Sequence, residues 1–145
     1  MNEVQALMGR EHDKLHSVLS DYQKHRGKSA ERAKQHFREF REGIRKHIIW
    51  EEEILYPLYE ERNGNRAAGP TVAMRGEHQK ILGLVEQLHG LISRDDWHTE
   101  QLESALIHLL SAHRDREEST IYPWMDESVS AKERLAAIAR LRAIV

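Results

Sequence analysis

An internal repeat constrains the fold of this 145-residue chain more than any other feature. Residues of the same type recur 66 positions apart, and they include histidine, glutamate, tyrosine and proline. The recurring pairs are His12 and His78, His47 and His113, Glu51 and Glu117, Tyr56 and Tyr122, and Pro57 and Pro123. Repetition on this scale indicates one structural unit used twice, and the simplest such unit here is a helical hairpin.

Apolar residues in both halves recur at steps of three and four, which is the spacing of one face of an α-helix. Four such rows occur, and each carries a histidine among its apolar residues. The rows are Met8, His12, Leu15, Leu19 and Tyr22; Phe37, Phe40, Ile44, His47, Glu51, Ile54 and Leu58; Met74, His78, Ile81, Val85 and Leu88; and Leu106, Leu110, His113, Glu117, Thr120 and Trp124. Each row predicts a helix whose buried face carries polar groups.

We expect these helices to form a single all-α domain over residues 1–145. One hairpin should cover about 2–63, a second about 70–128, and a short C-terminal helix about 130–144. Two antiparallel hairpins make an up-down-up-down four-helix bundle. The C-terminal helix either caps that bundle or forms a dimer contact.

Capping residues predict where the helices begin. Ser29 and Ser130 are suitable N-caps, and Pro70 suits a first helical turn. Pro57 and Pro123 should each kink a helix. The four long helices are predicted at about 2–25, 29–63, 70–93 and 99–128.

Composition excludes several classes of protein. The chain has 10 histidines but no cysteine, so disulfides, thiolate metal sites and iron–sulfur clusters are excluded. Its 22 basic residues are balanced by 24 acidic ones, which disfavours a nucleic-acid partner. It has no run of about 18 apolar residues and no signal-peptide pattern, so we expect a soluble cytoplasmic protein with no membrane partner.

Histidine and glutamate on apolar helix faces need a compensating partner. His47 and Glu51 share one face because they are four residues apart, and burying an unpaired charge costs several kcal/mol. A layer of hydrogen bonds and ion pairs would need arginine or lysine in the rows, and the rows contain neither. A divalent metal satisfies neutral imidazoles and carboxylates together.

The two equivalent halves favour two metal ions over one. Four histidines and two glutamates suit a pair of ions about 3.5–4 Å apart that the carboxylates bridge. Nitrogen and oxygen ligands favour iron, with manganese or zinc less favoured. A ferritin-like site is disfavoured, because none of the four histidines has a carboxylate three residues before it.

Four short elements resemble the hemerythrin-like, or HHE cation-binding, domain family. They occur in the order Glu11-His12, residues 47–57 (HIIWEEEILYP), Glu77-His78 and residues 113–123 (HRDREESTIYP). The resemblance covers roughly residues 8–125. It implies a hemerythrin-type four-helix bundle that holds an oxo- or hydroxo-bridged centre of two iron ions.

The resemblance also implies a role for individual residues. His12 and His47 would bind one iron, His78 and His113 the other, and Glu51 and Glu117 would bridge them. Oxygen-carrying members have an extra histidine where this chain has Leu82. Here the extra histidine is His16, at the equivalent place in the first half, and we include it among the metal ligands.

Some alternatives stay open on the sequence alone. Oxygen carriers take their second bridging carboxylate from the position of Glu118, so Glu118 competes with Glu117. His16 either ligates or lies at the edge of the core. Tyr56 and Tyr122 are either core aromatics or phenols beside the metals.

The resemblance implies binding of a small molecule, namely O2, NO or H2O2, by a monomer or homodimer. The expected role is oxygen binding or the detoxification of peroxide or nitric oxide, and whether this is enzymatic stays open. An iron store or an iron- or oxygen-responsive sensing module is the alternative. A purely structural bundle with a polar core layer is a third.

Overall fold

The computed structural model describes residues 2–63 and 69–144, and these residues form helices without any strand. The all-helical prediction is confirmed, and the predicted helix ends agree with the structure to within one or two residues. The elements are α1 (Glu3–His25), α2 (Ala30–Trp50), a π-helical turn η1 (Glu51–Leu55), α3 (Tyr56–Asn63), α4 (Pro70–Ser93), α5 (Glu100–Arg116), a second π-helical turn η2 (Glu117–Ile121), α6 (Tyr122–Ser128) and α7 (Ala131–Ala143).

The predicted caps are present. The Ser29 hydroxyl accepts a hydrogen bond from the Arg32 amide at the start of α2, and the Ser130 hydroxyl accepts one from the Glu133 amide at the start of α7. Pro70 occupies the first position of α4. The first backbone N–H groups of a helix have no partner within the helix. Ser29 and Ser130 each accept a hydrogen bond from one of these groups, and Pro70 has no N–H to leave unpaired.

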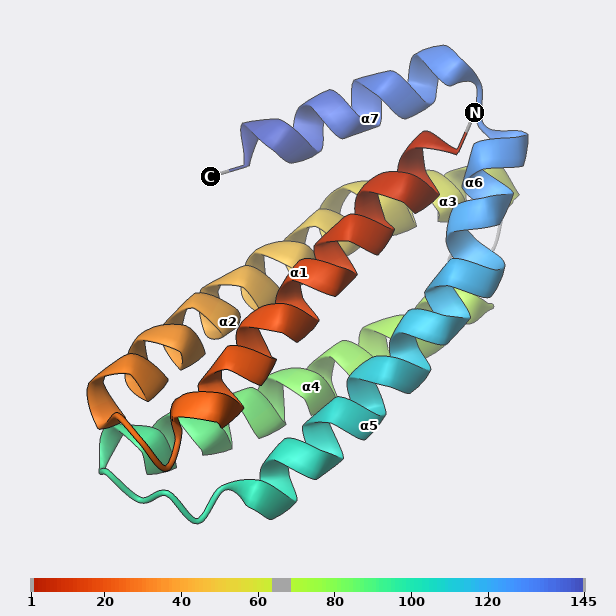
Figure 1. The fold of residues 1–145 in the computed structure, drawn as a ribbon. Helices are drawn as coiled ribbons and strands as arrows, with labels where there is room; N and C mark the ends of the chain where they lie inside the picture. Colours follow the sequence, from red (N-terminus) through yellow and green to blue (C-terminus); the bar gives the residue numbers. More distant parts are fainter. Residues whose placement is uncertain (1, 64–68, 145) are drawn as a thin grey trace.

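The four long helices lie side by side, with α1 packed along α2 and α4 packed along α5 (Figure 1). Within each pair, the second helix runs back along the first. The histidine-bearing faces of all four helices meet in one interior. α7 crosses one end, near the N-terminus, and contacts α1, η1 and α6. The C-terminal helix therefore covers this end of the helical core.

The buried core consists of two apolar clusters. One lies toward α7 and includes Met8, Leu55 and Met125. The other fills the far end and includes Leu19 and Phe40. In every long helix the histidine falls between residues of the two clusters, so a polar layer separates them.

Each expected proline kink is accompanied by a π-helical turn directly before the Tyr-Pro pair. Proline has no N–H, and its ring would clash with the carbonyl four residues earlier. In η1 the Tyr56 amide instead bonds the carbonyl of Glu51, five residues earlier, and η2 repeats this between Tyr122 and Glu117. Residues five apart are thereby brought one turn apart on the same side of the chain.

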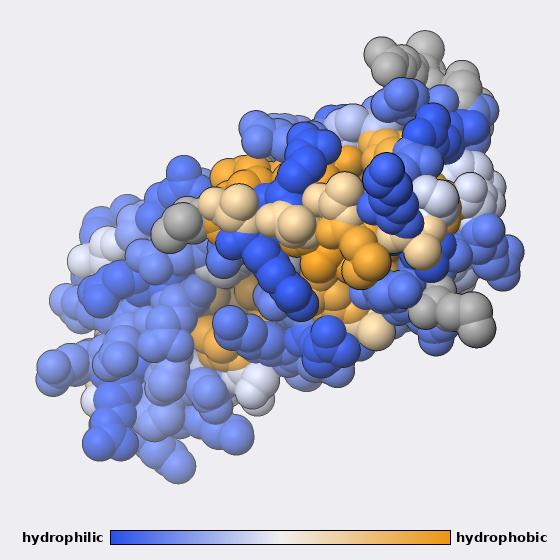
Figure 2. Space-filling model, turned by 90° about the horizontal axis from the view of Figure 1, so that it is seen from above, coloured by the Kyte–Doolittle hydropathy of each residue, from blue (hydrophilic) through white to orange (hydrophobic). Residues whose placement is uncertain are grey.

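Arg134 fixes α7 to the rest of the molecule. Its buried guanidinium pairs with Glu3 and donates to the carbonyls of Asp126 and Val129. The face that carries α7 has apolar side chains at its centre, ringed by hydrophilic ones (Figure 2). Leu135 of α7 is 56% exposed. No helix within 2–63 and 69–144 is long and apolar enough to cross a bilayer.

Candidate metal centre

Four histidines from four helices meet in the polar layer. His12 comes from α1, His47 from α2, His78 from α4 and His113 from α5, and all four are buried. The Nε2 atoms of His12 and His47 lie 3.1 Å apart, and those of His78 and His113 also lie 3.1 Å apart. The imidazoles therefore form two facing pairs.

Glu51 and Glu117 lie between the two histidine pairs, and neither side chain is exposed to solvent. The Oε1 atom of Glu51 is 3.0 Å from the Nε2 atom of His78 and 3.5 Å from that of His47. Glu117 places one oxygen 3.2 Å from His12 and the other 3.2 Å from His113. Each carboxylate therefore reaches both pairs.

These six residues form two groups that could each hold a cation. In each group, four ligand atoms lie within 4.8 Å of one another, and both groups share the two carboxylates. The groups are His12, His47, Glu51 and Glu117; and Glu51, His78, His113 and Glu117. The structure thus brings together the six residues that the repeat singled out.

Three of the four imidazoles also contact an outer carboxylate through Nδ1. His12 pairs with Glu118 at 2.8 Å, and His78 pairs with Glu52 at 2.6 Å. His113 contacts Glu77 at 2.7 Å. Glu118 thus lies on the outer side of His12 and is absent from both groups, whereas the outer role of Glu77 was not predicted. The repeated Glu-His dipeptide was the available signal.

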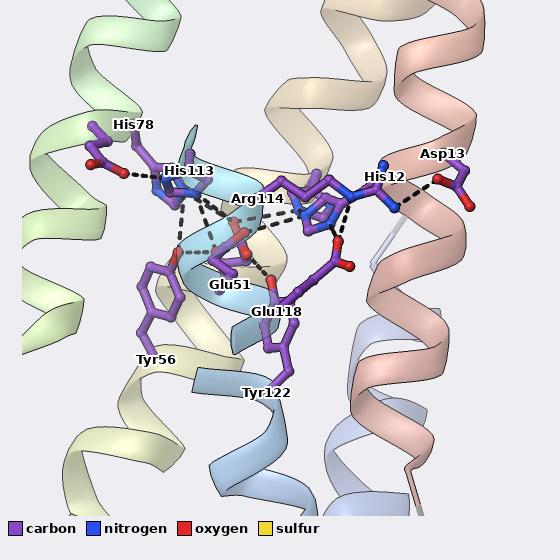
Figure 3. A network of polar contacts seen from close by, with 12 residues as sticks. His12, Asp13, Glu51, Tyr56, His78, His113, Arg114, Glu118 and Tyr122 are labelled. Atoms are coloured by element: carbon purple, nitrogen blue, oxygen red, sulfur yellow. Dashed lines mark hydrogen bonds and ion pairs between the residues drawn. The ribbon is translucent and has the colours of Figure 1, made fainter. Parts of the chain in front are cut away.

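The two tyrosines contact the shared carboxylates. Tyr56 donates to Glu117, and Tyr122 donates to Glu51 (Figure 3). Burial, followed by the charges of Glu51 and Glu117, raises the pKa of both phenols well above the usual value. The phenols therefore stay protonated and act as donors.

A cavity of about 70 Å³ adjoins the four histidines. Most of its lining surface is apolar; besides the four histidines and Glu51, polar groups come from His16, Ser111 and Arg114. The apolar lining is Leu15, Leu19, Ile44, Ile48, Ile81, Ile107 and Leu110. His16 is exposed and belongs to neither four-residue group, so its role as a ligand stays a prediction.

The family of the hemerythrin HHE cation-binding domain matches residues 4–125, which is most of the chain. The chain belongs to this family. A search of curated proteins and a search of solved structures gave no match. The resemblance seen in the sequence is therefore confirmed, and membership of the hemerythrin HHE family implies a metal cation as cofactor.

The donor chemistry of this hemerythrin domain fits such a cation. Where Nδ1–H donates to a glutamate, Nε2 of the same neutral ring carries a lone pair. His78 and His113 both have such an outer glutamate, so in their neutral, metal-binding forms two lone pairs would face each other across 3.1 Å. In addition, the Oε1 atom of Glu117 is buried without a hydrogen bond. A metal ion between these atoms would satisfy all of them.

The carboxylates of this hemerythrin domain favour the protonated form of three of the four imidazoles. Burial alone would lower the pKa of His113, but the carboxylates of Glu117, at 3.2 Å, and Glu51, at 3.9 Å, outweigh burial and raise that pKa to about 11. The same balance, through Glu117 for His12 and Glu51 for His78, raises the pKa of those two imidazoles. A metal ion must therefore displace protons in order to bind.

Glu51 is held in its charged form. Burial alone would raise the pKa of this carboxyl, but the positive charge of His47 and hydrogen bonds within the site keep it well below the usual value. The carboxylate is therefore available to a cation at neutral pH.

Proposed function

We propose that this protein is a non-haem diiron protein of hemerythrin type that binds O2, NO or peroxide. In this proposal the chain is one domain, an antiparallel up-down-up-down four-helix bundle with a capping C-terminal helix. One observation carries this proposal: two pairs of imidazoles share the carboxylates of Glu51 and Glu117, and they adjoin a cavity with a mostly apolar lining.

Each residue of the centre has a distinct role in this proposal. His12 and His47 would hold one iron, His78 and His113 would hold the other, and Glu51 and Glu117 would serve both. The iron supplies the binding and redox chemistry that amino-acid side chains lack. The phenols of Tyr56 and Tyr122 fix the orientation of Glu117 and Glu51 by hydrogen bonding.

The cavity selects the size and polarity of the ligand. A volume of about 70 Å³ is sufficient for a molecule of a few atoms, and an apolar lining disfavours charged or bulky substrates. The side chains of His16, Ser111 and Arg114 in its lining offer hydrogen-bonding groups to an incoming ligand. These features favour O2, NO and H2O2 over larger molecules.

The test begins with anaerobic reconstitution of the metal-free protein with ferrous iron. We expect two iron ions per chain and a higher melting temperature. Less than one ion per chain, together with unchanged melting, would contradict a metal centre and leave a structural polar layer as the explanation.

Mixing the ferrous protein with O2, NO or H2O2 then identifies the activity. A reversible optical change with O2 supports oxygen binding, a stable NO adduct supports nitric oxide handling, and rapid loss of H2O2 supports detoxification. Each of these three assignments also requires that replacing Glu51 abolishes the reaction with the small molecule.

Iron storage, or iron- or oxygen-responsive sensing without turnover, is the second candidate. One observation favours it: all six donor residues are buried, so metal binding and core stability are coupled. Slow irreversible oxidation with no adduct, accompanied by a large change in melting temperature, would support this function over small-molecule binding.

A further inference from the structure

We propose that the two metal positions have unequal affinities, with the His78 and His113 position filling first and the His12 and His47 position exchanging its ion readily. The proposal rests on the proposed metal centre. It assigns to Arg114 the role of a positioning residue that weakens metal binding at the His12 and His47 position. It concerns metal binding, so it can be tested without any activity.

The repeat makes the two positions directly comparable, and their outer contacts differ. His78 and His113 each contact an outer carboxylate, Glu52 and Glu77 respectively. In the other half His12 contacts Glu118, but the Nδ1 atom of His47 is buried without a hydrogen-bond partner in the described part of the chain.

The missing partner of His47 has an obvious counterpart in the sequence. Glu11 stands where the repeat places Glu77, and Glu11 and His47 both line the groove between α1 and α2. Among the described residues, however, no hydrogen bond or ion pair joins them. One ligand of the first position therefore lacks the support that its equivalent receives.

The contact that the first position does have is shared with a cation. The Oε2 atom of Glu118 faces both the Nδ1 atom of His12, at 2.8 Å, and the Nε atom of Arg114, at 2.5 Å. A second arm of Arg114 contacts Asp13 at 2.7 Å and holds the guanidinium in place (Figure 3). Arg114 therefore takes part of the negative charge that would otherwise polarise His12.

In the second half, no cation of the described residues contacts the carboxylate oxygen that faces an imidazole. Ile48 occupies the position equivalent to Arg114. Arg75 pairs with the carboxylate of Glu60 and contacts Glu52 at its backbone carbonyl. Glu77 does pair with Arg116, but through Oε2, whereas His113 faces Oε1. Each imidazole of this half thus has a carboxylate oxygen to itself.

Outer carboxylates orient a ligating imidazole and increase its strength as a donor, and their loss commonly costs 10- to 100-fold in metal affinity. His47 lacks an outer acceptor, and His12 shares its acceptor with Arg114. Both differences weaken the metal position that these two histidines form. We therefore expect the two affinities to differ by roughly 10- to 100-fold. At limiting metal the protein would carry one ion, held by His78 and His113 with the shared carboxylates.

Both affinities are measured by anaerobic titration calorimetry, in which Fe²⁺ is added to the metal-free protein. We expect two binding events in the wild-type protein. Arg114→Ile, which copies Ile48, should strengthen the weaker event and bring the two affinities together. Glu118→Gln should weaken only that event, and it provides a second test should Arg114→Ile fold poorly.

The repeat supplies a matched pair of control variants. Glu77→Gln should weaken the tighter event, whereas Glu11→Gln should change neither. Titration with Mn²⁺ gives an independent signal, since one ion per chain should show the paramagnetic resonance of an isolated ion and two ions that of a coupled pair.

Two equal binding events would overturn the inequality, as would a Glu11→Gln effect as large as that of Glu77→Gln. Loss of the tighter event in Glu118→Gln would overturn the assignment. Absence of any binding would instead overturn the proposed metal centre itself, and the titration distinguishes that result at once.

Discussion

Tyr56 of α3 donates a hydrogen bond to Glu117 of η2, which lies 61 residues later in the chain. The reciprocal contact runs from Tyr122 to Glu51. Each hairpin thus supplies the phenol that fixes the other hairpin's shared carboxylate. The candidate site is held together across the two repeats at its most buried point.

Removing either phenolic hydroxyl should destabilise the metal-free protein. Tyr56→Phe leaves the buried carboxylate of Glu117 short of one donor, and we expect a loss of about 1–3 kcal/mol in the free energy of unfolding. Urea denaturation measures it. Tyr59→Phe is the control, because Tyr59 is buried but its hydroxyl makes no hydrogen bond in the described residues. Equal effects of the two variants would count against the contact.

Glu51 belongs to both four-residue groups, so its replacement should affect both metal positions. We expect Glu51→Gln to reduce bound iron from two ions per chain to well below one, as determined by metal analysis after gel filtration. Glu53→Gln serves as its control, since Glu53 is exposed two residues away. Retention of two ions in Glu51→Gln would show that this carboxylate does not bridge.

His16→Leu, which copies Leu82 of the second half, should leave two ions per chain. His16 is exposed and lies outside both groups, although it lines the cavity. The expected change is confined to the rate at which the ferrous protein reacts with O2, measured by stopped flow. A fall to one ion per chain would instead identify His16 as a ligand.

The metal-free protein should lose stability as the pH rises above about 6.5. The pKa values of His12, His78 and His113 are raised in the folded state, so their contribution is complete below the unfolded value and disappears as the pH rises toward the folded values, about 11 for His113. The lowered pKa of Glu51 contributes stability that is lost as the pH falls below about 4.5.

Melting temperatures of the metal-free protein between pH 4 and 9 measure this dependence, with a maximum expected between about 4.5 and 6.5. His113→Gln should flatten the decline above the maximum. His98→Gln should not, because the His98 side chain is fully exposed. A melting temperature that increases from pH 6 to 9 would contradict the prediction.

Two helical glycines should respond differently to alanine. A Cβ atom at Gly83 of α4 meets no atom within 4 Å, so Gly83→Ala should stabilise the protein by about 0.5–1 kcal/mol through lower backbone entropy in the unfolded chain. At Gly43 of α2 the new atom would lie 2.8 Å from Leu15, and the gain should be smaller or reversed. Chemical denaturation of both variants tests the difference.

The sequence predicted the helices well because each has a regular apolar row and a recognisable start. It also singled out the six central His and Glu residues, since all of them lie on those rows. The two tyrosines could not be assigned in the same way. Tyr56 lies five positions after Glu51, and only the π-helical turn brings the two residues to one side of the chain.

Residue spacing also could not predict the contacts between the histidines and the outer carboxylates. Glu11 and Glu77 are equivalent in the sequence, yet only Glu77 contacts a histidine in the described structure. Arg114 lies outside the apolar rows, and its effect depends on the side-chain positions of Asp13 and Glu118. Repeats predict what two halves share, whereas their differences depend on packing between the helices.

Each four-residue group takes three donors from one hairpin and one carboxylate from the other. A single hairpin therefore offers an incomplete coordination sphere, and a second copy facing it across a twofold axis would complete both positions at once. This geometry is what a symmetric dimer of one ancestral hairpin would require. Within one chain the two halves need not be identical, and the equivalent positions of Ile48 and Arg114 carry different residues beside the shared site.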